Sequence, residues 1–318
     1  MAFATTSVAA VLTGLSGSDF LSSADTTAQQ TAALLQLATQ LKRGERRIDL
    51  GNRVLGLIFS KASTRTRVSF QVAMARLGGQ TVDLNPQLTQ LGRGEPLEDT
   101  ARVLSRFCDV LAIRTFAQQE LADYAHWASI PVINALTDLE HPCQALADFL
   151  TMQEAFGDLQ GQTLAYVGDG NNVAHSLMLC GALLGVNVRI GCPEGFEPLP
   201  GVVDQARALS VGGAQISVIT DPVEAVRGAQ ALYTDVWASM GQEQEQAERE
   251  RAFQGFCLNE DLLAEADSRA IVLHCLPAHR GEEISAGVME GPSSRIFDQA
   301  ENRLHAQQAL LAALLGGL

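Results

Sequence analysis

The chain has 318 residues, of which 47% are hydrophobic and 18% are charged, enough apolar material for packed cores in about two domains. Its formal net charge of −14 disfavours binding to the phosphate backbone of nucleic acids. No stretch is apolar for the length of a membrane span, and the first ten residues lack the basic and apolar regions of a signal peptide. We expect a cytoplasmic protein with no nucleic-acid or membrane partner.

The six cysteines form no Cys-x-x-Cys pair, and the spacing of cysteines and histidines matches no zinc-binding pattern. We therefore expect reduced thiols, most of them small core residues, and no metal site. The cysteines are Cys108, Cys143, Cys180, Cys192, Cys257 and Cys275.

A strand followed by a helix is predicted over residues 54–79, after an amphipathic helix over 25–42. The apolar run Val54–Phe59 predicts a buried strand. Apolar residues then recur at helical spacing, and Gly78-Gly79 is expected to end that helix. The recurring residues are Val68, Val72, Ala75 and Leu77.

The segment Ser63-Thr64-Arg65-Thr66-Arg67 lies where this strand has ended and the helix begins. The first N–H groups of a helix have no partner within it and carry the positive end of its dipole. The hydroxyl and guanidinium groups of the segment add further donors, so it predicts a socket for a phosphate dianion. The alternative is an ordinary helix start with solvated arginines.

Strands and helices alternate through the first half of the chain, which predicts a mainly parallel sheet. The expected elements are strands over 81–84, 110–113 and 130–134, a loop over 85–96 and a helix over 97–107. Ligands of such sheets bind at the carboxyl ends of the strands, where Arg65 and Arg114 lie. His141, taken alone, is better interpreted as a structural histidine near a helix start. Its position after another strand end, beside Gln144, strengthens the case for a functional role.

The alternation restarts at residue 163, which indicates a second domain. Strands are expected over 163–167, 186–190, 215–220, 231–235 and 271–273, with a charged, solvated helix over 242–251 and a C-terminal helix from Phe297. The turn Gly168–Val173 has part of a dinucleotide-binding fingerprint, but Val173 replaces its third glycine. We interpret it as a turn that carries an asparagine into the ligand site.

Five segments together resemble the aspartate/ornithine carbamoyltransferase family, in the order found in its ornithine-specific members. They are the anion loop 63–67, His-Pro-Cys-Gln at 141–144, Asp-x-Trp-x-Ser-Met-Gly at 235–241, His-Cys-Leu-Pro at 274–277 and Ala-Glu-Asn-Arg at 300–303. The match covers nearly the whole chain. Ser60 and Gln71 stand where many members have Glu, and we expect no loss of chemistry from either.

The resemblance implies an α/β fold of two domains, each a mainly parallel sheet flanked by helices. It implies a carbamoyl-phosphate-binding domain over 1–150, an ornithine-binding domain over 151–296 and a C-terminal helix over 297–318 that packs back on the first domain. The reaction would transfer the carbamoyl group from carbamoyl phosphate to the side-chain amine of L-ornithine, without a cofactor or metal.

The site residues follow from the same resemblance, motif by motif. Carbamoyl phosphate would be bound by Ser63, Thr64, Arg65, Thr66, Gln90, Arg114, His141, Gln144, Cys275, Leu276 and Arg303. Ornithine would be bound by Asn172, Asp235, Ser239 and Met240. The catalytic residues among them would be Arg114, His141, Cys275 and Arg303. Gln90 would reach the site of a neighbouring subunit, which implies a homotrimer or a multiple of it.

Several alternatives differ in the residues that they explain. Putrescine would leave Asp235 and Asn172 without partners, and N-acetylornithine would lose the ammonium group that pairs with Asp235. An NAD-linked oxidoreductase would use the turn at Gly168 but would explain neither segment 63–67 nor segment 274–277. A binding or regulatory module without catalysis would not need the intact set of polar residues.

Overall fold

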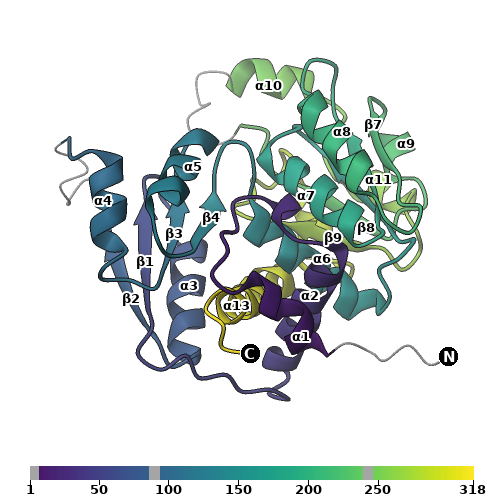
Figure 1. Cartoon of the computed structure of the whole chain (residues 1–318). Coiled ribbons are helices and arrows are strands. Elements are labelled where there is room, and N and C mark those ends of the chain that lie inside the picture. The colour runs from purple at the N-terminus through teal and green to yellow at the C-terminus, as the bar shows by residue number, and fades with distance from the viewer. Residues whose placement is uncertain (1–6, 86–93, 239–245) are drawn as a thin grey trace. The chain divides into compact units, whose positions relative to one another are not determined.

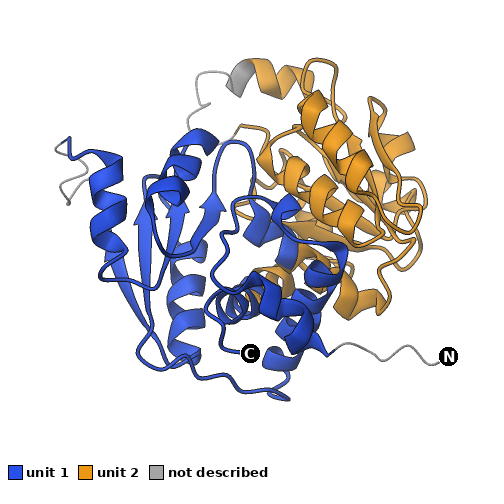
Figure 2. Cartoon of the chain, viewed as in Figure 1, with its two compact units in different colours: residues 1–146, 303–318 blue, residues 147–302 orange. Residues whose placement is uncertain are grey.

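The computed structural model describes residues 7–85, 94–238 and 246–318. The chain forms two compact units (Figure 2): unit 1 comprises residues 1–146 and 303–318, and unit 2 comprises residues 147–302. The ligand-binding domains expected to end at residues 150 and 296 stay a prediction. The two units are defined by their compactness and not by what they bind.

Unit 1 is built on a four-stranded parallel sheet in the order β2-β1-β3-β4 (Figure 1). Its strands are β1 Val54–Phe59, β2 Gln80–Leu84, β3 Val110–Arg114 and β4 Val132–Leu136. β1 and β3 are central and almost fully buried, as expected for the Val- and Leu-rich strands of a parallel sheet. β4 starts two residues later than expected because Pro131 has no N–H to donate to a neighbouring strand.

The helices of unit 1 connect and flank this sheet (Figure 1). They are α1 Val8–Leu12, η1 Thr13–Leu15, η2 Ser23–Asp25, α2 Ala28–Lys42, α3 Arg65–Arg76, α4 Leu97–Leu104 and α5 Gln118–Trp127. Two more helices, α6 Pro142–Phe156 and α13 Ile296–Leu314, each contribute residues to both units. Residues 303–314 of α13 belong to unit 1, so the C-terminal helix packs on the first sheet unit as expected.

Helix α3 ends where the sequence predicts, and its buried face includes neither Val68 nor Val72. Gly78 has a φ of +78°, and the N–H of Gly79 donates to the Met74 carbonyl, so the two glycines cap the helix. Val68 and Val72 belong to the apolar repeat that predicted the helix, but both are exposed. The buried side chains are Thr66, Phe70, Ala73 and Met74, a stripe that the helical period allows equally well.

Unit 2 is built on a five-stranded parallel sheet in the order β7-β6-β5-β8-β9. Its strands are β5 Thr163–Val167, β6 Asn187–Gly191, β7 Ile216–Ile219, β8 Ala231–Thr234 and β9 Ile271–His274. The remaining helices are α7 Asn172–Leu183, α8 Pro200–Leu209, α9 Pro222–Val226, α10 Gln246–Ala252, α11 Glu260–Ala264 and α12 Ala286–Met289. Strand order reverses at β5, so the turns after β5 and β8 lie at a ligand-binding position of this fold class.

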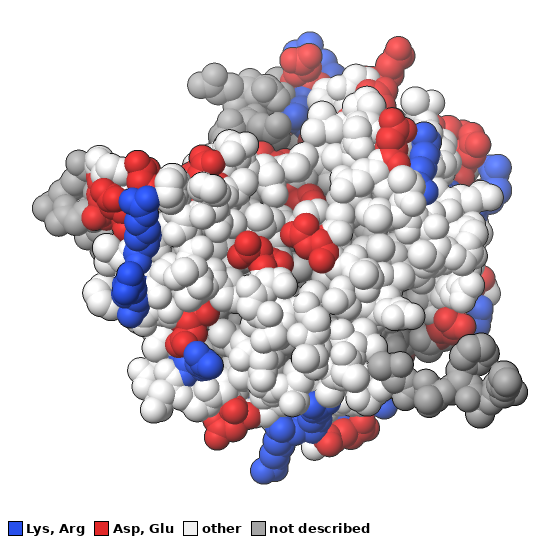
Figure 3. All heavy atoms as spheres, viewed as in Figure 1, with Lys and Arg blue, Asp and Glu red and all other residues white. Residues whose placement is uncertain are grey.

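The surface carries charged side chains of both signs, scattered between uncharged ones on the face shown in Figure 3. Within the described ranges, no helix is both long and apolar enough to cross a membrane.

Candidate active site

The predicted anion loop lies at the carboxyl end of β1 and leads into α3. Thr64 is the N-cap residue of α3, and its carbonyl accepts the first helical hydrogen bond from the Val68 N–H. The Thr64 hydroxyl makes no capping hydrogen bond. The N–H groups of the first turn and the hydroxyls of Ser63 and Thr64 are therefore suited to an anion at this end.

The two arginines of the loop have different surroundings. Arg67 forms an ion pair with Asp83, and its guanidinium lies 5.0 Å from the centroid of the Phe59 ring. Arg65 instead lies near enough to His141 for its charge to affect that imidazole. Arg65 is therefore the better candidate for a substrate phosphate, because Asp83 already compensates Arg67.

The charges of three arginines act on the buried imidazole of His141. Burial, together with the charges of Arg303, Arg114 and Arg65, holds the pKa of His141 well below its usual range. The imidazole is therefore neutral at pH 7. Three cations therefore act on one neutral ring, within a chain whose net charge is −14.

Arg303 links three helices of unit 1 at this site. Its Nη1 donates to the Gln144 side-chain oxygen on α6 at 2.5 Å, and its Nη2 donates to the Thr66 hydroxyl on α3 at 3.0 Å. Arg303, Gln144 and Thr66 are all buried. Arg114, the last residue of β3, completes the group at the neighbouring strand end. Residues far apart in the sequence thus form one polar cluster.

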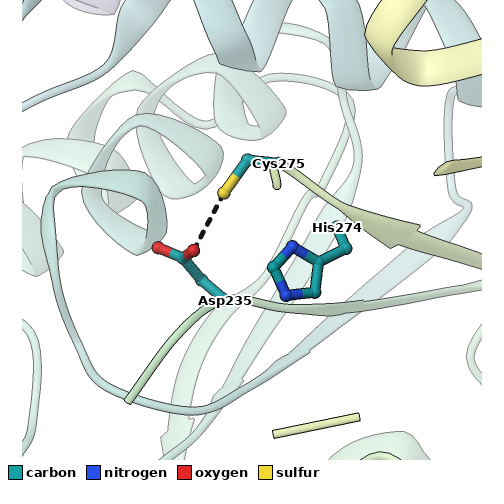
Figure 4. A group of neighbouring side chains, drawn as sticks. All are labelled: Asp235, His274 and Cys275. Atoms are coloured by element: carbon teal, nitrogen blue, oxygen red, sulfur yellow. Dashed lines mark hydrogen bonds between the residues drawn. The ribbon is translucent and has the colours of Figure 1, made fainter. Parts of the chain in front are cut away.

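A second cluster lies at the ends of β8 and β9 in unit 2 (Figure 4). The Cys275 thiol donates to Oδ1 of Asp235 at 2.9 Å, and the Asn171 amide donates to Oδ2 of the same carboxylate at 3.0 Å. Burial and the charge of Asp235 raise the pKa of Cys275 well above its usual value. The sulfur is therefore a protonated donor and not a thiolate.

His274 supports the turn that carries Cys275. Its Nδ1 accepts a hydrogen bond from the Leu276 N–H at 2.9 Å, so the proton lies on Nε2, which donates to Glu283 at 3.0 Å. Leu276 has a φ of +61°, an uncommon conformation for a residue with a side chain, and the bond to His274 helps to hold it.

Asp235, His274 and Cys275 are also of types that can bind a metal ion. Among the described residues, donor atoms of Asp235, His274 and Cys275 lie within 4.8 Å of one another. Both ring nitrogens of His274 already have protein partners, and the Cys275 thiol donates to Asp235. These hydrogen bonds occupy the atoms of His274 and Cys275 that a metal ion would need.

Asn171 and Asn172 follow β5, in the turn that was expected to carry an asparagine. Oδ1 of Asn171 accepts from the N–H groups of Val173 and Ala174 and caps α7, while its amide reaches Asp235. Asn172 is the first residue of α7 and half-buried. The role of Asn171 was not foreseen, although an asparagine before a helix is a common cap signal.

Arg249 is a further residue that the sequence analysis missed. Its stretch was expected to be solvated, yet Arg249 is only 7% exposed. Its Nη1 donates at 2.8 Å both to Oδ2 of Asp169 and to the Trp237 carbonyl. Asp169 lies in the turn after β5, before Asn171, and Trp237 follows Asp235, so one guanidinium holds together the two segments that carry this cluster.

Replacing Arg249 with methionine should disturb the Asp235 cluster and leave the His141 cluster unchanged. If unit 2 binds the amino acid, its KM should rise by roughly 10- to 100-fold, the effect of losing a buried charged hydrogen bond. The KM of the anionic substrate should change little. Arg251→Met, an exposed position on the same helix, is the matched control. Equal effects of the two variants would contradict the positioning role of Arg249.

Three candidate residues lie outside the described residues: Gln90, Ser239 and Met240. The remaining predicted residues separate into two groups. Unit 1 holds Ser63, Thr64, Arg65, Thr66, Arg114, His141, Gln144 and Arg303, and unit 2 holds Asn172, Asp235, Cys275 and Leu276.

Two family models match the chain and together cover most of it. The carbamoyl-P binding domain of aspartate/ornithine carbamoyltransferase matches residues 18–154, and the Asp/Orn binding domain of the same family matches residues 160–314.

Individual proteins match over nearly their whole length. The chain is 85% identical over 311 residues to an ornithine carbamoyltransferase of Prochlorococcus marinus strain MIT 9313, covering 98% of each chain. The crystal structure of ornithine carbamoyltransferase from Gloeobacter violaceus is 58% identical, with a TM-score of 0.86 over 93% of this chain and 98% of that one. The ornithine carbamoyltransferase structure from Pyrococcus furiosus is 48% identical, with a TM-score of 0.92 over 96% and 99%. The chain therefore belongs to the aspartate/ornithine carbamoyltransferase family.

Proposed function

We propose that this chain transfers the carbamoyl group of carbamoyl phosphate to the side-chain amine of L-ornithine, which yields L-citrulline and phosphate, a reaction of arginine biosynthesis. The observation that carries this proposal is the buried cluster of unit 1, in which Arg303 donates to Gln144 and Thr66 and the charges of three arginines act on His141. The names of the high-identity relatives agree with it.

Unit 1 would bind carbamoyl phosphate. Ser63, Thr64, Arg65 and Thr66 would hold the phosphate, since a helix start, hydroxyls and an arginine supply donors in several directions. Arg114, His141 and Gln144 would bind the carbamoyl group, and Arg303 would orient Gln144 and Thr66 through the hydrogen bonds that it donates to them.

The chemistry requires a neutral amine and a stabilised oxygen. An alkyl amine has a pKa near about 10.4, so only a small fraction is neutral at pH 7, and a site that excludes water favours that form. When the amine attacks, the carbamoyl oxygen gains negative charge. Arg114, the neutral His141 and the Thr66 hydroxyl would stabilise it, and phosphate would leave toward Arg65.

Unit 2 would bind ornithine. The Asp235 carboxylate suits the α-ammonium group, and Asn172, Ser239 and Met240 would contact the rest of the amino acid. Cys275 and Leu276 would lie beside the reacting groups. Putrescine lacks the α-ammonium and α-carboxylate, and N-acetylornithine lacks the α-ammonium charge, so both should be poorer substrates.

The Cys275→Ser variant should be impaired but active. The pKa of this thiol is raised by burial and by Asp235, so it is not an activated nucleophile, and a serine hydroxyl can still donate to Asp235. We expect kcat to fall by about tenfold, a hydrogen-bond-sized effect. Mass spectrometry during turnover should show no carbamoyl adduct on Cys275. A trapped adduct would overturn the assigned role.

The direct test is citrulline formation from ornithine and carbamoyl phosphate, measured beside putrescine, N-acetylornithine and L-aspartate as acceptors. Ornithine should have the highest kcat/KM. A preference for any of the other acceptors, or no turnover with all four, would overturn the proposal.

The turn after β5 is poorly suited to NAD, the competing hypothesis of another class. The Gly170 N–H donates to the Phe196 carbonyl at 2.8 Å, and a Cβ at Gly170 would lie 2.2 Å from the Pro198 nitrogen. The first N–H groups of α7 are already capped by Asn171. A pyrophosphate would need this space and these donors. No NAD binding should be detected by titration.

We further propose a cytoplasmic homotrimer, or a multiple of it, in which Gln90 of one subunit completes the site of the next. A cyclic contact can place one subunit's loop over the strand ends of its neighbour. The loop would help to exclude water and would add a polar group that the site's own chain does not supply.

Complementation tests this shared site. The variants Arg65→Ala and Gln90→Ala should each be largely inactive. If they are unfolded, mixed equally and refolded together, random cyclic trimers should regain roughly a quarter of the wild-type sites. Activity that stays at the sum of the two variants would show that Gln90 does not act across subunits.

A further inference from the structure

Unit 1 contains a second basic site, remote from the His141 cluster along α3. A cavity of about 560 Å³ lies at the C-terminal ends of α2 and α3, beside the chain that follows α2 and beside Gln308 of α13. Its wall includes Arg76 from the last turn of α3, whereas Arg65 begins that helix. Eleven residues of helix separate these arginines by roughly 16 Å, so the two sites share no side chain.

Three arginines line this cavity: Arg46, Arg47 and Arg76. Within the described ranges, none of these guanidinium groups has an ion pair or side-chain hydrogen bond. Arg43, which is close in sequence, does not line the cavity and lies 3.8 Å from the Glu45 carboxylate. Asp49 is the one acidic residue among the lining residues, and its Oδ1 accepts from the Gly51 N–H at 2.8 Å.

Favourable interaction with helix dipoles does not explain why all three arginines lie at this cavity. Cations are favoured near helix C-termini, and Arg76 stands in the last turn of α3. The end of α3 is already capped by Gly78 and Gly79, and the Gly44 N–H donates to the Leu41 carbonyl at the end of α2. Arg46 and Arg47 lie beyond that cap, where the dipole effect has largely decayed.

The rest of the wall is apolar apart from one amide. Leu41, Ile48 and Leu77 contribute aliphatic side chains. Gln308 is only 5% exposed, and its amide has no hydrogen-bond partner among the described residues, although it lines the cavity. A buried amide without a protein partner usually bonds to water or a ligand.

We propose that this cavity binds an organic phosphate of nucleotide size. The arginines would contact the phosphates, and the aliphatic wall would contact the organic group of the ligand. The Gln308 amide would form a hydrogen bond with a polar edge of that group. The volume is within the range of small-molecule sites, which combine apolar walls with a few polar groups. Arginine suits phosphate because its planar fork donates two parallel hydrogen bonds.

Calorimetric titration of the full chain with three probes tests each part of the proposal. ADP has both the phosphates and the organic group, inorganic pyrophosphate has the phosphates alone, and adenosine has the organic group alone. ADP should bind at least tenfold more tightly than either of the other probes. Gln308→Leu keeps the side-chain volume nearly the same but removes the amide. It should lower the affinity for ADP and leave the affinity for pyrophosphate unchanged.

Variants assign the binding to this cavity. The double variant Arg46→Ala/Arg47→Ala should weaken ADP and pyrophosphate by at least tenfold, whereas the matched control Arg43→Ala should bind both as the wild type does. Arg65→Ala removes a cation from the other basic site and should leave ADP affinity unchanged. ADP binding that is lost in Arg65→Ala, that survives the double variant, or that is undetectable in the wild type would overturn the proposal, whatever the outcome of the citrulline assay.

Discussion

Arg65→Ala should lower kcat/KM for carbamoyl phosphate by roughly 10²- to 10³-fold, the effect of removing one charged donor from a developing or leaving anion. The substitution removes the cation at the start of α3 and one of the three positive charges around His141. Steady-state kinetics with each substrate varied in turn measures the change. The dissociation constant of ornithine should remain near the wild-type value.

Arg67→Ala provides a matched control two residues away in the same helix. Asp83 already pairs with Arg67, so its removal should cost much less than the removal of Arg65. Thermal unfolding of both variants separates a loss of function from a loss of structure. If Arg67→Ala were as damaging as Arg65→Ala, general disruption of the loop would explain the loss better than phosphate anchoring.

Asp235→Asn should raise the dissociation constant of ornithine by roughly 10- to 100-fold, because the α-ammonium group would lose its charged partner. Carbamoyl phosphate binding should be nearly unchanged, because its proposed contacts lie mainly in unit 1. Asp235 also accepts from Cys275 and Asn171, and an asparagine retains one oxygen for these donors.

Two measurements distinguish the charge effect from a local rearrangement. Calorimetry gives both dissociation constants, and citrulline formation with putrescine tests for the α-ammonium directly. Putrescine has no ammonium group for Asp235, so its low activity should be similar in the variant and the wild type. Equal weakening of both substrates, or of neither, would count against the assignment of Asp235.

Local patterns in the sequence predicted most of the secondary structure and part of the site. The strand Val54–Phe59 has the expected bounds because an uninterrupted apolar run suits a central parallel strand. The periodicity of α3 predicted the helix and its end but not its buried face, because a helix with apolar residues on two sides does not specify which side is buried. In the structure Phe70 is buried and Val68 is exposed.

Long-range partners could not be predicted from spacing. Arg303 was assigned only through its motif, and its bond to Thr66 joins residues 237 positions apart. Arg249 sits among charged neighbours that indicate a solvated helix, yet it is buried against Asp169. Such pairings depend on which distant segments the fold brings together. The periodicity of a single sequence does not contain that information.

The discontinuity of unit 1 affects the order in which a newly made chain can acquire its structure. Synthesis at about 5–20 residues per second implies that residues 147–302 take roughly 8 to 30 s to make. Unit 2 is contiguous, so its sheet needs no residue beyond 302 and can assemble before Arg303 leaves the ribosome. The phosphate-binding half is begun first but completed last, when Arg303 becomes available to Thr66 and Gln144. A released chain truncated before residue 303 should therefore be well formed in residues 147–302 and deficient in the earlier unit.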